Sequence, residues 1–162
     1  MTHLKEYNKG KIHDVLVKPL PKILDERGWL SELFRSDEID SNLMPVMAYI
    51  SMTLPGVARG PHEHREQADC FAFLGPSNFK IYLWDSRNES STYGVKQYIY
   101  AGIDNPILVI VPAGVVHAYK NIGGDNGIVI NAPNQLYAGN GKSTPVDEIR
   151  HEDAADSPFR LD

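Results

Sequence analysis

Residues 56–75 read Gly-Val-Ala-Arg-Gly-Pro-His-Glu-His-Arg-Glu-Gln-Ala-Asp-Cys-Phe-Ala-Phe-Leu-Gly and lie between a strand-like run and a second apolar run. The eleven residues 59–69 of this stretch include the ionisable side chains Arg59, His62, His64, Glu66 and Asp69. In a β-rich chain such groups are not buried together without partners, because an unpaired charge in an apolar interior is costly. The stretch is therefore expected to form either an active site or a solvated loop.

A second segment, much later in the chain, favours the active-site interpretation. It reads Pro112-Ala-Gly-Val-Val-His117-Ala-Tyr-Lys-Asn121 and carries a single His in an ordered setting. Two such segments, one with paired His and one with a single His, resemble the motif pair of the cupin barrel. The chain is accordingly expected to be all-β, a cupin double-stranded β-helix (jelly roll) formed by one domain over residues 1–162.

The hydrophobic pattern supports this fold class. Short runs of alternating or β-branched residues, separated by Gly and Pro turns, are typical of a sandwich or barrel. One helical turn is expected over residues 36–42, and the polar tail after residue 138 shows no clear period. The strand candidates are residues 11–17, 29–34, 48–54, 69–74, 78–85, 94–101, 106–111 and 126–131.

Composition narrows the class of protein. The net charge of -5 and the absence of a basic run argue against nucleic acid as a partner. The single Cys70 excludes an intramolecular disulfide and, in its apolar run, is expected to be a core residue. The N-terminus lacks a signal-type apolar core, and no apolar run approaches the roughly 18 residues that span a bilayer. A cytoplasmic protein without membrane contact is expected.

The two segments also fit a metal-binding cupin. The first segment would supply His62, His64 and an acid. Ala68 holds the expected acid position, and Asp69 or Glu66 beside it would serve as the ligand. The second segment would supply His117. Three imidazoles and one carboxylate suit a divalent transition metal such as Fe, Mn, Zn or Ni.

Most of the chain, from about residue 16 to residue 159, resembles the nucleotide-sugar 3,5-epimerases, a branch of the cupins typified by dTDP-4-dehydrorhamnose 3,5-epimerase. The resemblance implies a homodimer whose N-terminal strands exchange between subunits. It also implies action on a nucleotide-linked 4-keto-6-deoxy sugar, in deoxysugar and polysaccharide biosynthesis, with no metal or cofactor. It rests on four motifs in the right order: Asp25-Glu-Arg-Gly-Trp-Leu-Ser-Glu-Leu-Phe, Gly56-Val-Ala-Arg-Gly-Pro-His, Asp85-Ser-Arg-Asn-Glu-Ser-Ser-Thr-Tyr-Gly and Val111-Pro-Ala-Gly-Val-Val-His-Ala-Tyr.

The resemblance implies a proton-transfer mechanism. In that family a His removes the proton beside the 4-keto group, a Lys and other donors stabilise the enolate, and a Tyr on the opposite face returns a proton. A neutral imidazole suits a base near pH 7. The resemblance makes His62 the base, places Asn131 where the family has its Tyr, and puts the aromatic Tyr137 near the substrate. The candidate substrate-binding residues are Arg27, Glu32, Arg59 and His117, together with His64 and Asp69, which typical members lack.

Several positions depart from the family pattern. The Lys position falls on Ala68 or Asp69, and a negative charge there would repel an enolate. Met47 and Tyr49 stand where the family has Gln and Asn near the nucleotide, and the C-terminal Asp that polarises the base His has no evident counterpart. Three functions stay open: an epimerase or isomerase reacting at one carbon, a metal-dependent cupin enzyme, and a sugar-nucleotide-binding protein without activity.

Overall fold

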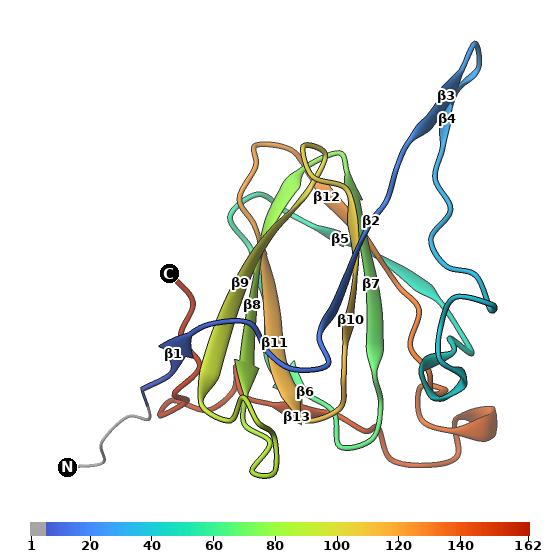
Figure 1. The fold of residues 1–162 in the computed structure, drawn as a ribbon. Helices are drawn as coiled ribbons and strands as arrows, with labels where there is room; N and C mark the ends of the chain where they lie inside the picture. Colours follow the sequence, from blue (N-terminus) through green and yellow to red (C-terminus); the bar gives the residue numbers. More distant parts are fainter. Residues whose placement is uncertain (1–5) are drawn as a thin grey trace.

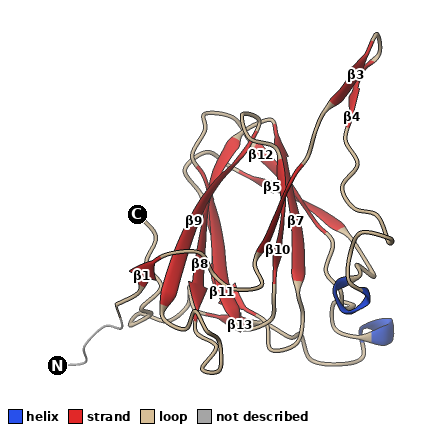
Figure 2. Cartoon of the chain, viewed as in Figure 1, coloured by secondary structure: helices blue, strands red, loops and turns tan. Residues whose placement is uncertain are grey.

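The computed structural model describes residues 6–162, which form two β-sheets facing each other around an apolar interior (Figure 1). One sheet has six strands in the order β1-β9-β8-β11-β6-β13, and the other has five in the order β2-β10-β7-β12-β5. A small hairpin, β3-β4, stands apart from both sheets. The all-β jelly roll expected from the sequence is confirmed, and Figure 2 shows that helix is confined to two single turns.

The strand bounds agree with most of the expected strands. The 3-10 turns are η1 (Ser41–Leu43) and η2 (Asn140–Lys142). The strands are β1 (Asn8–Lys9), β2 (Leu16–Pro19), β3 (Ile23–Asp25), β4 (Gly28–Leu30), β5 (Tyr49–Thr53), β6 (Ala58–Glu63), β7 (Asp69–Gly75), β8 (Asn78–Asp85), β9 (Val95–Gly102), β10 (Ile107–Val111), β11 (Val115–Asn121), β12 (Gly127–Asn131) and β13 (Ile149–Arg150).

Strand β8 shows how the sequence builds the layers. Its alternate residues Phe79, Ile81 and Leu83 enter the core between the sheets, as the period of two requires. Tyr82 and Trp84 point the other way and are also buried, because the C-terminal segment lies over this outer face. The polar tail is therefore ordered against the barrel. Its Phe159 is 7% exposed, and burying such a side chain stabilises the fold by roughly 1.5–3 kcal/mol.

The outer face of the second sheet is covered by the segment that joins β4 to β5. Leu33, Phe34, Ile39 and Leu43 of this segment pack against a buried cluster on β7 and β10, which is completed by the residues that follow β2 and β12. That cluster contains Cys70, which is buried as expected, and burial raises the pKa of its thiol to about 12. The segment therefore works as an apolar cover for this sheet.

Three N-terminal expectations are corrected. Residues 11–17 do not form a strand: Ile12 is buried in the core, a turn follows, and β2 begins only at Leu16. The strand expected over 29–34 ends at Leu30, after which the chain leaves to cover the second sheet. The helical turn expected over 36–42 is replaced by a hydrogen-bonded turn and then η1.

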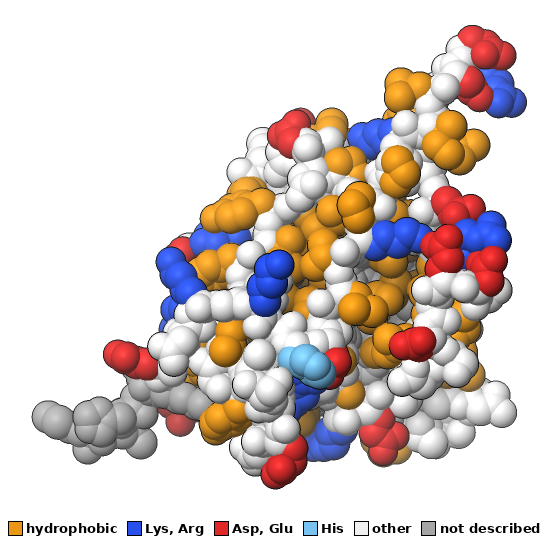
Figure 3. Space-filling model, in the orientation of Figure 1, with side chains coloured by type: hydrophobic (Ala, Val, Ile, Leu, Met, Phe, Trp, Pro, Cys, Tyr) orange, Lys and Arg blue, Asp and Glu red, His pale blue; other side chains and the backbone are white. Residues whose placement is uncertain are grey.

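Hairpin β3-β4 projects from the barrel with its apolar side chains uncovered (Figures 1 and 3). Leu24 is 77% exposed, and Ile23, Trp29 and Leu30 are each more than half exposed. Contiguous apolar surface of this kind is typical of an interaction site. Among the residues that the structure describes, no helix is long and apolar enough to cross a membrane.

Candidate functional site

The paired strands β6 and β11 bring the two His motifs together, and the start of β7 in the facing sheet adds Asp69. His62 lies on β6 directly opposite His117 on β11, and His64 and Asp69 flank the turn from β6 to β7. The four side chains have ligand atoms within 4.8 Å of one another. Gly60, with φ +79°, permits this approach, because a Cβ there would lie 2.6 Å from the His117 carbonyl oxygen. His62, His64 and Asp69 of this stretch are therefore gathered into one site, whereas Glu66 is exposed in the β6–β7 turn.

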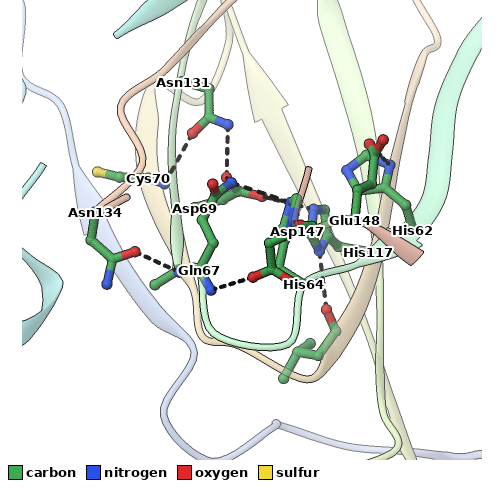
Figure 4. A network of polar contacts seen from close by, with 12 residues as sticks. His62, His64, Gln67, Asp69, Cys70, His117, Asn131, Asn134, Asp147 and Glu148 are labelled. Carbon is green, nitrogen blue, oxygen red and sulfur yellow. Dashed lines mark hydrogen bonds and ion pairs between the residues drawn. The ribbon is translucent and has the colours of Figure 1, made fainter. Parts of the chain in front are cut away.

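Asp69 is the centre of the buried part of the site (Figure 4). It is 1% exposed, and its Oδ2 lies 3.1 Å from Nε2 of both His64 and His117. Its Oδ1 accepts hydrogen bonds from Gln67 and Asn131, each at 2.9 Å. Burial alone would raise the pKa of Asp69, but the two facing imidazoles outweigh it and lower that pKa. Asp69 is thus a fixed carboxylate.

His64 carries the balancing positive charge. Its Nδ1 donates to the backbone carbonyl of Asp147, so the ring can present a donor to Asp69 as well only when it is protonated. Burial opposes that charge, but the Asp69 carboxylate outweighs burial and raises the pKa of His64 to about 9. The site therefore contains an imidazolium next to a carboxylate at neutral pH.

The polar tail supplies the support for His64. The Asp147 carboxylate accepts hydrogen bonds from the backbone N–H groups of Arg65, Glu66 and Gln67 at 2.9–3.0 Å. Burial opposes the charge of this carboxylate, but the three donors outweigh it and lower the pKa of Asp147. The tail is fastened to the β6–β7 turn by this one residue.

His62 is the most exposed of the three imidazoles: its side chain is 16% exposed, against 9% for His64 and 4% for His117. It lines the main cavity, and its Nδ1 lies 4.0 Å from Oε1 of Glu148 on the tail. Burial, followed by the neighbouring charge on His117, lowers the pKa of His62 to about 3. A neutral imidazole with a carboxylate behind it has the arrangement of a general base whose conjugate acid can be stabilised.

The cavity has a volume of about 1060 Å³, in the upper range for small-molecule sites. The two sheets and the tail all contribute to its wall: Tyr49 from β5, His62 from β6 and Tyr119 from β11. Cationic side chains of Arg59, Lys142 and Arg150 also line it. Such a rim is suited to phosphate groups.

Of the other residues predicted to contact the substrate, some line the cavity and some lie on or next to the projecting hairpin. Arg59 and Tyr137 line it, as expected for substrate contacts. Arg27 does not: it lies at the tip of the projecting hairpin and pairs with Asp25. Glu32 follows the hairpin and lies near Arg35, also away from the cavity lining. Arg27 and Glu32 therefore do not reach the cavity of their own chain, because the hairpin extends away from the barrel.

Three of the predicted site residues are buried behind the cavity wall. Asn131, Asp69 and His117 are 1%, 1% and 3% exposed and do not line the cavity. The sequence predicted that these side chains contact the substrate directly. Their burial places them behind the wall instead, where they support the residues that line the cavity. Asn131 donates to Tyr49 and Asp69, and His117 faces Asp69.

Sequence reasoning missed Asp147 and Glu148, and it placed Tyr49 near the nucleotide without giving it a role. The two acids sit in a tail without period, and only its return to the β6 edge through β13 brings them to the histidines. The only local signal for these two residues in the sequence is that two acids stand side by side directly before the Ile149–Arg150 strand. A carboxylate close to His62, for which the sequence showed no evident candidate, is supplied by Glu148, whose Oε1 lies 4.0 Å from Nδ1.

Fold and site together define the class of protein: a cupin jelly roll whose histidine-lined cavity has the size of a small-molecule site. Residues 9–147 match the family model of dTDP-4-dehydrorhamnose 3,5-epimerase. The chain therefore belongs to this family of nucleotide-sugar epimerases.

Two curated relatives agree with this membership. The "Probable low-salt glycan biosynthesis epimerase Agl13" of Haloferax volcanii is 38% identical over 127 residues, which are 78% of this chain and 81% of the relative. The spore coat polysaccharide biosynthesis protein SpsL of Bacillus subtilis is 39% identical over 114 residues, 69% of this chain and 73% of the relative.

Solved structures share the fold. A dTDP sugar isomerase from Desulfovibrio desulfuricans superposes with a TM-score of 0.77 at 22% identity, covering 92% of this chain and 91% of that one. A dTDP-6-deoxy-D-glucose-3,5-epimerase from Legionella pneumophila, in complex with dTDP-4-keto-L-rhamnose, has a TM-score of 0.73 at 18% identity, covering 90% and 76%. At these identities the likeness concerns the fold alone.

Proposed function

We propose that this protein epimerises a nucleotide-linked 4-keto-6-deoxy sugar, with His62 as the base that removes the proton beside the ketone. The observation that carries the proposal is the position of His62. It is the neutral imidazole of the cluster that lines the cavity, and Glu148 stands 4.0 Å behind its Nδ1. A Cβ built on Gly60 would also meet Nδ1, at 3.1 Å, so Nε2 is the nitrogen left for the substrate.

The charges around the cavity suit the other parts of such a substrate. The His64 imidazolium lines the cavity and offers a cation for the enolate oxygen, the task that the family gives to a Lys. Arg59, Lys142 and Arg150 would hold the diphosphate. The substrate class is supported by the Legionella relative, which was captured with a dTDP-linked keto sugar, and by two relatives named for glycan and polysaccharide biosynthesis.

The test is proton NMR in D₂O with dTDP- and GDP-linked 4-keto-6-deoxy sugars. Wild-type protein is expected to exchange the proton at C3 or C5 for deuterium, and His62→Ala is expected to lose this exchange while keeping its circular dichroism spectrum. Exchange at an unchanged rate in His62→Ala would refute the role of His62. Binding of the sugars with no exchange in the wild type would leave a sugar-nucleotide-binding protein.

A homodimer is part of the proposal. The uncovered apolar side chains of hairpin β3-β4 would pack on a second copy, and the exchange of hairpins would carry Arg27 and Glu32 away from their own barrel to the partner's. Leu24→Asp, which places a charge on the most exposed of these apolar side chains, is expected to give monomers in light scattering. A wild-type protein that is monomeric at micromolar concentration would refute the dimer.

One observation favours a second candidate, a metal-dependent cupin. Oδ2 of Asp69 and Nε2 of His117 are fully buried and lie 3.1 Å apart, but neither has a partner with hydrogen-bond geometry, and such atoms in a native protein call for an explanation. The set His62, His64, Asp69 and His117 has the donor chemistry of a transition-metal site, and a bound divalent cation would act there as a Lewis acid. Elemental analysis of protein purified without chelators decides: about one metal per chain supports this candidate, and well under one rejects it.

A further inference from the structure

Inversion at carbon needs two groups. A base removes the proton from one face of the sugar, and an acid must return a proton to the opposite face of the planar enolate. A single imidazole that keeps its place cannot reach both faces of a bound ring. The proposed function therefore leaves one role open, and the following inference rests on that function.

The two sheets supply the geometry for two opposed groups. His62 reaches the cavity from β6 of the six-stranded sheet, and Tyr49 reaches it from β5, the edge strand of the five-stranded sheet. A sugar held between the sheets would meet the imidazole on one face and the phenol on the other. Resemblance to the family puts Tyr49 among residues near the nucleotide, whereas the topology puts it in the sheet that faces the one carrying His62.

The hydroxyl of Tyr49 is oriented by a buried amide. Nδ2 of Asn131 donates to the Tyr49 oxygen at 2.8 Å and to Oδ1 of Asp69 at 2.9 Å. The amide cannot be reversed, because its Oδ1 accepts the backbone N–H of Cys70 at 3.1 Å. The Tyr49 oxygen is thus an acceptor toward the protein, and its own proton is left to point into the cavity. The same amide would stabilise the phenolate once that proton has left.

Other tyrosines of the cavity are less suited. Tyr119 lies on β11, in the same sheet as His62, and its hydroxyl shares a hydrogen bond with Ser51 at 3.1 Å. Tyr137 lies in the segment after β12 and is 55% exposed. Burial raises the pKa of Tyr49 to about 12, so that its hydroxyl keeps its proton at neutral pH until the enolate takes it.

We propose that Tyr49 is the acid of the reaction, returning the proton to the sugar face opposite His62. The step balances without a co-reactant. The phenol O–H bond breaks, a C–H bond forms on the enolate carbon, and the enolate electrons supply that bond as the ketone is restored. The phenolate then takes a proton from water, and the imidazolium of His62 returns its proton to water.

The experiment compares wild type with Tyr49→Phe, on the same keto sugars in D₂O, by following deuterium and configuration separately. In Tyr49→Phe, His62 still removes the proton and can return deuterium to the face it came from. We therefore expect deuterated sugar of unchanged configuration, with formation of the inverted epimer reduced at least 100-fold. The matched control is Tyr100→Phe, which removes an exposed hydroxyl on β9 outside the cavity lining and is expected to invert within about fivefold of the wild-type rate.

Each other outcome has a distinct meaning. Inversion by Tyr49→Phe at the wild-type rate would overturn the assignment of Tyr49 and leave the proposed function standing. Loss of both exchange and inversion in a folded Tyr49→Phe protein would also overturn it, since Tyr49 would then serve binding or the base step. Absence of exchange in the wild type would overturn the proposed function itself, and the role of Tyr49 with it.

Discussion

The most informative perturbation of the site is Glu148→Gln, because it keeps the shape of the side chain and removes only its charge. When His62 accepts a proton, the new imidazolium lies 4.0 Å from Oε1 of Glu148. Two opposite unit charges at that distance attract by about 4 kcal/mol at an effective dielectric constant of 20, and by about 1 kcal/mol in bulk water. The side chains of His62 and Glu148 are 16% and 21% exposed, so the value lies between these limits. The rate of proton abstraction should fall by a factor between about 5 and about 1000.

The assay is the initial rate of deuterium wash-in, measured from pH 5 to pH 9 for both proteins. A purely structural role for Glu148 would lower the rate equally at every pH. Loss of a charge that supports the imidazolium should in addition move the acidic limb of the profile to lower pH, because the free base becomes weaker. Glu152→Gln is the matched control, since Glu152 lines the same cavity but makes no ion pair with His62 within the described residues. A Glu148→Gln protein that exchanges within twofold of wild type, with an unshifted limb, would refute the argument.

Two predictions concern stability. Asp147→Asn removes the carboxylate that accepts three backbone N–H bonds at 2.9–3.0 Å and should lower the free energy of unfolding in urea by roughly 2 kcal/mol, given the partial exposure of Asp147. The exposed Asp153→Asn should change it by less than about 0.5 kcal/mol, and equal effects would mean that Asp147 does not fasten the tail. The raised pKa of His64, about 9 against 6.5 for the free side chain, predicts a contribution that is complete below pH 6.5 and lost as the pH rises through 9. That contribution is on the order of 3 kcal/mol, so the wild type should lose its advantage over His64→Gln between pH 6 and pH 9.5, and a constant difference would contradict the charge on His64.

The fold was predictable because its determinants are local in the sequence. Period-two alternation in β8 and the apolar run of β10 mark strands wherever they occur, and turns at Gly56 and Gly75 separate them. Strands β6 and β11 carry too much charge or too many turn residues to show that pattern, so they were recognised only as His motifs. The N-terminal strands were misplaced because the burial of their side chains is decided by elements distant in the sequence. Ile12, for example, is buried in the core among residues of later strands.

The site was only half predictable for a related reason. His62, His64 and His117 lie within motifs, so their spacing reveals them. Glu148 and Asp147 depend on where a polar tail crosses the barrel, and nothing local encodes that path. Tyr49 depends on the register of β5 with β12, which sets it opposite Asn131. A one-residue slip in that pairing would turn Tyr49 to the outside of the sheet.

The charge at the Lys position illustrates why a single substitution is a poor guide to function. An Asp in that place would repel an enolate if it faced the substrate, and from the sequence alone this argues against catalysis. In the structure Asp69 faces inward, with one oxygen held by two amides and the other by two imidazoles. The group that lines the cavity is instead His64, whose positive charge Asp69 maintains and which the proposed mechanism sets against the enolate. The negative charge of Asp69 thereby keeps His64 positively charged at the cavity wall. In the proposed mechanism an enolate would meet a positive charge there, as it would with the family's Lys.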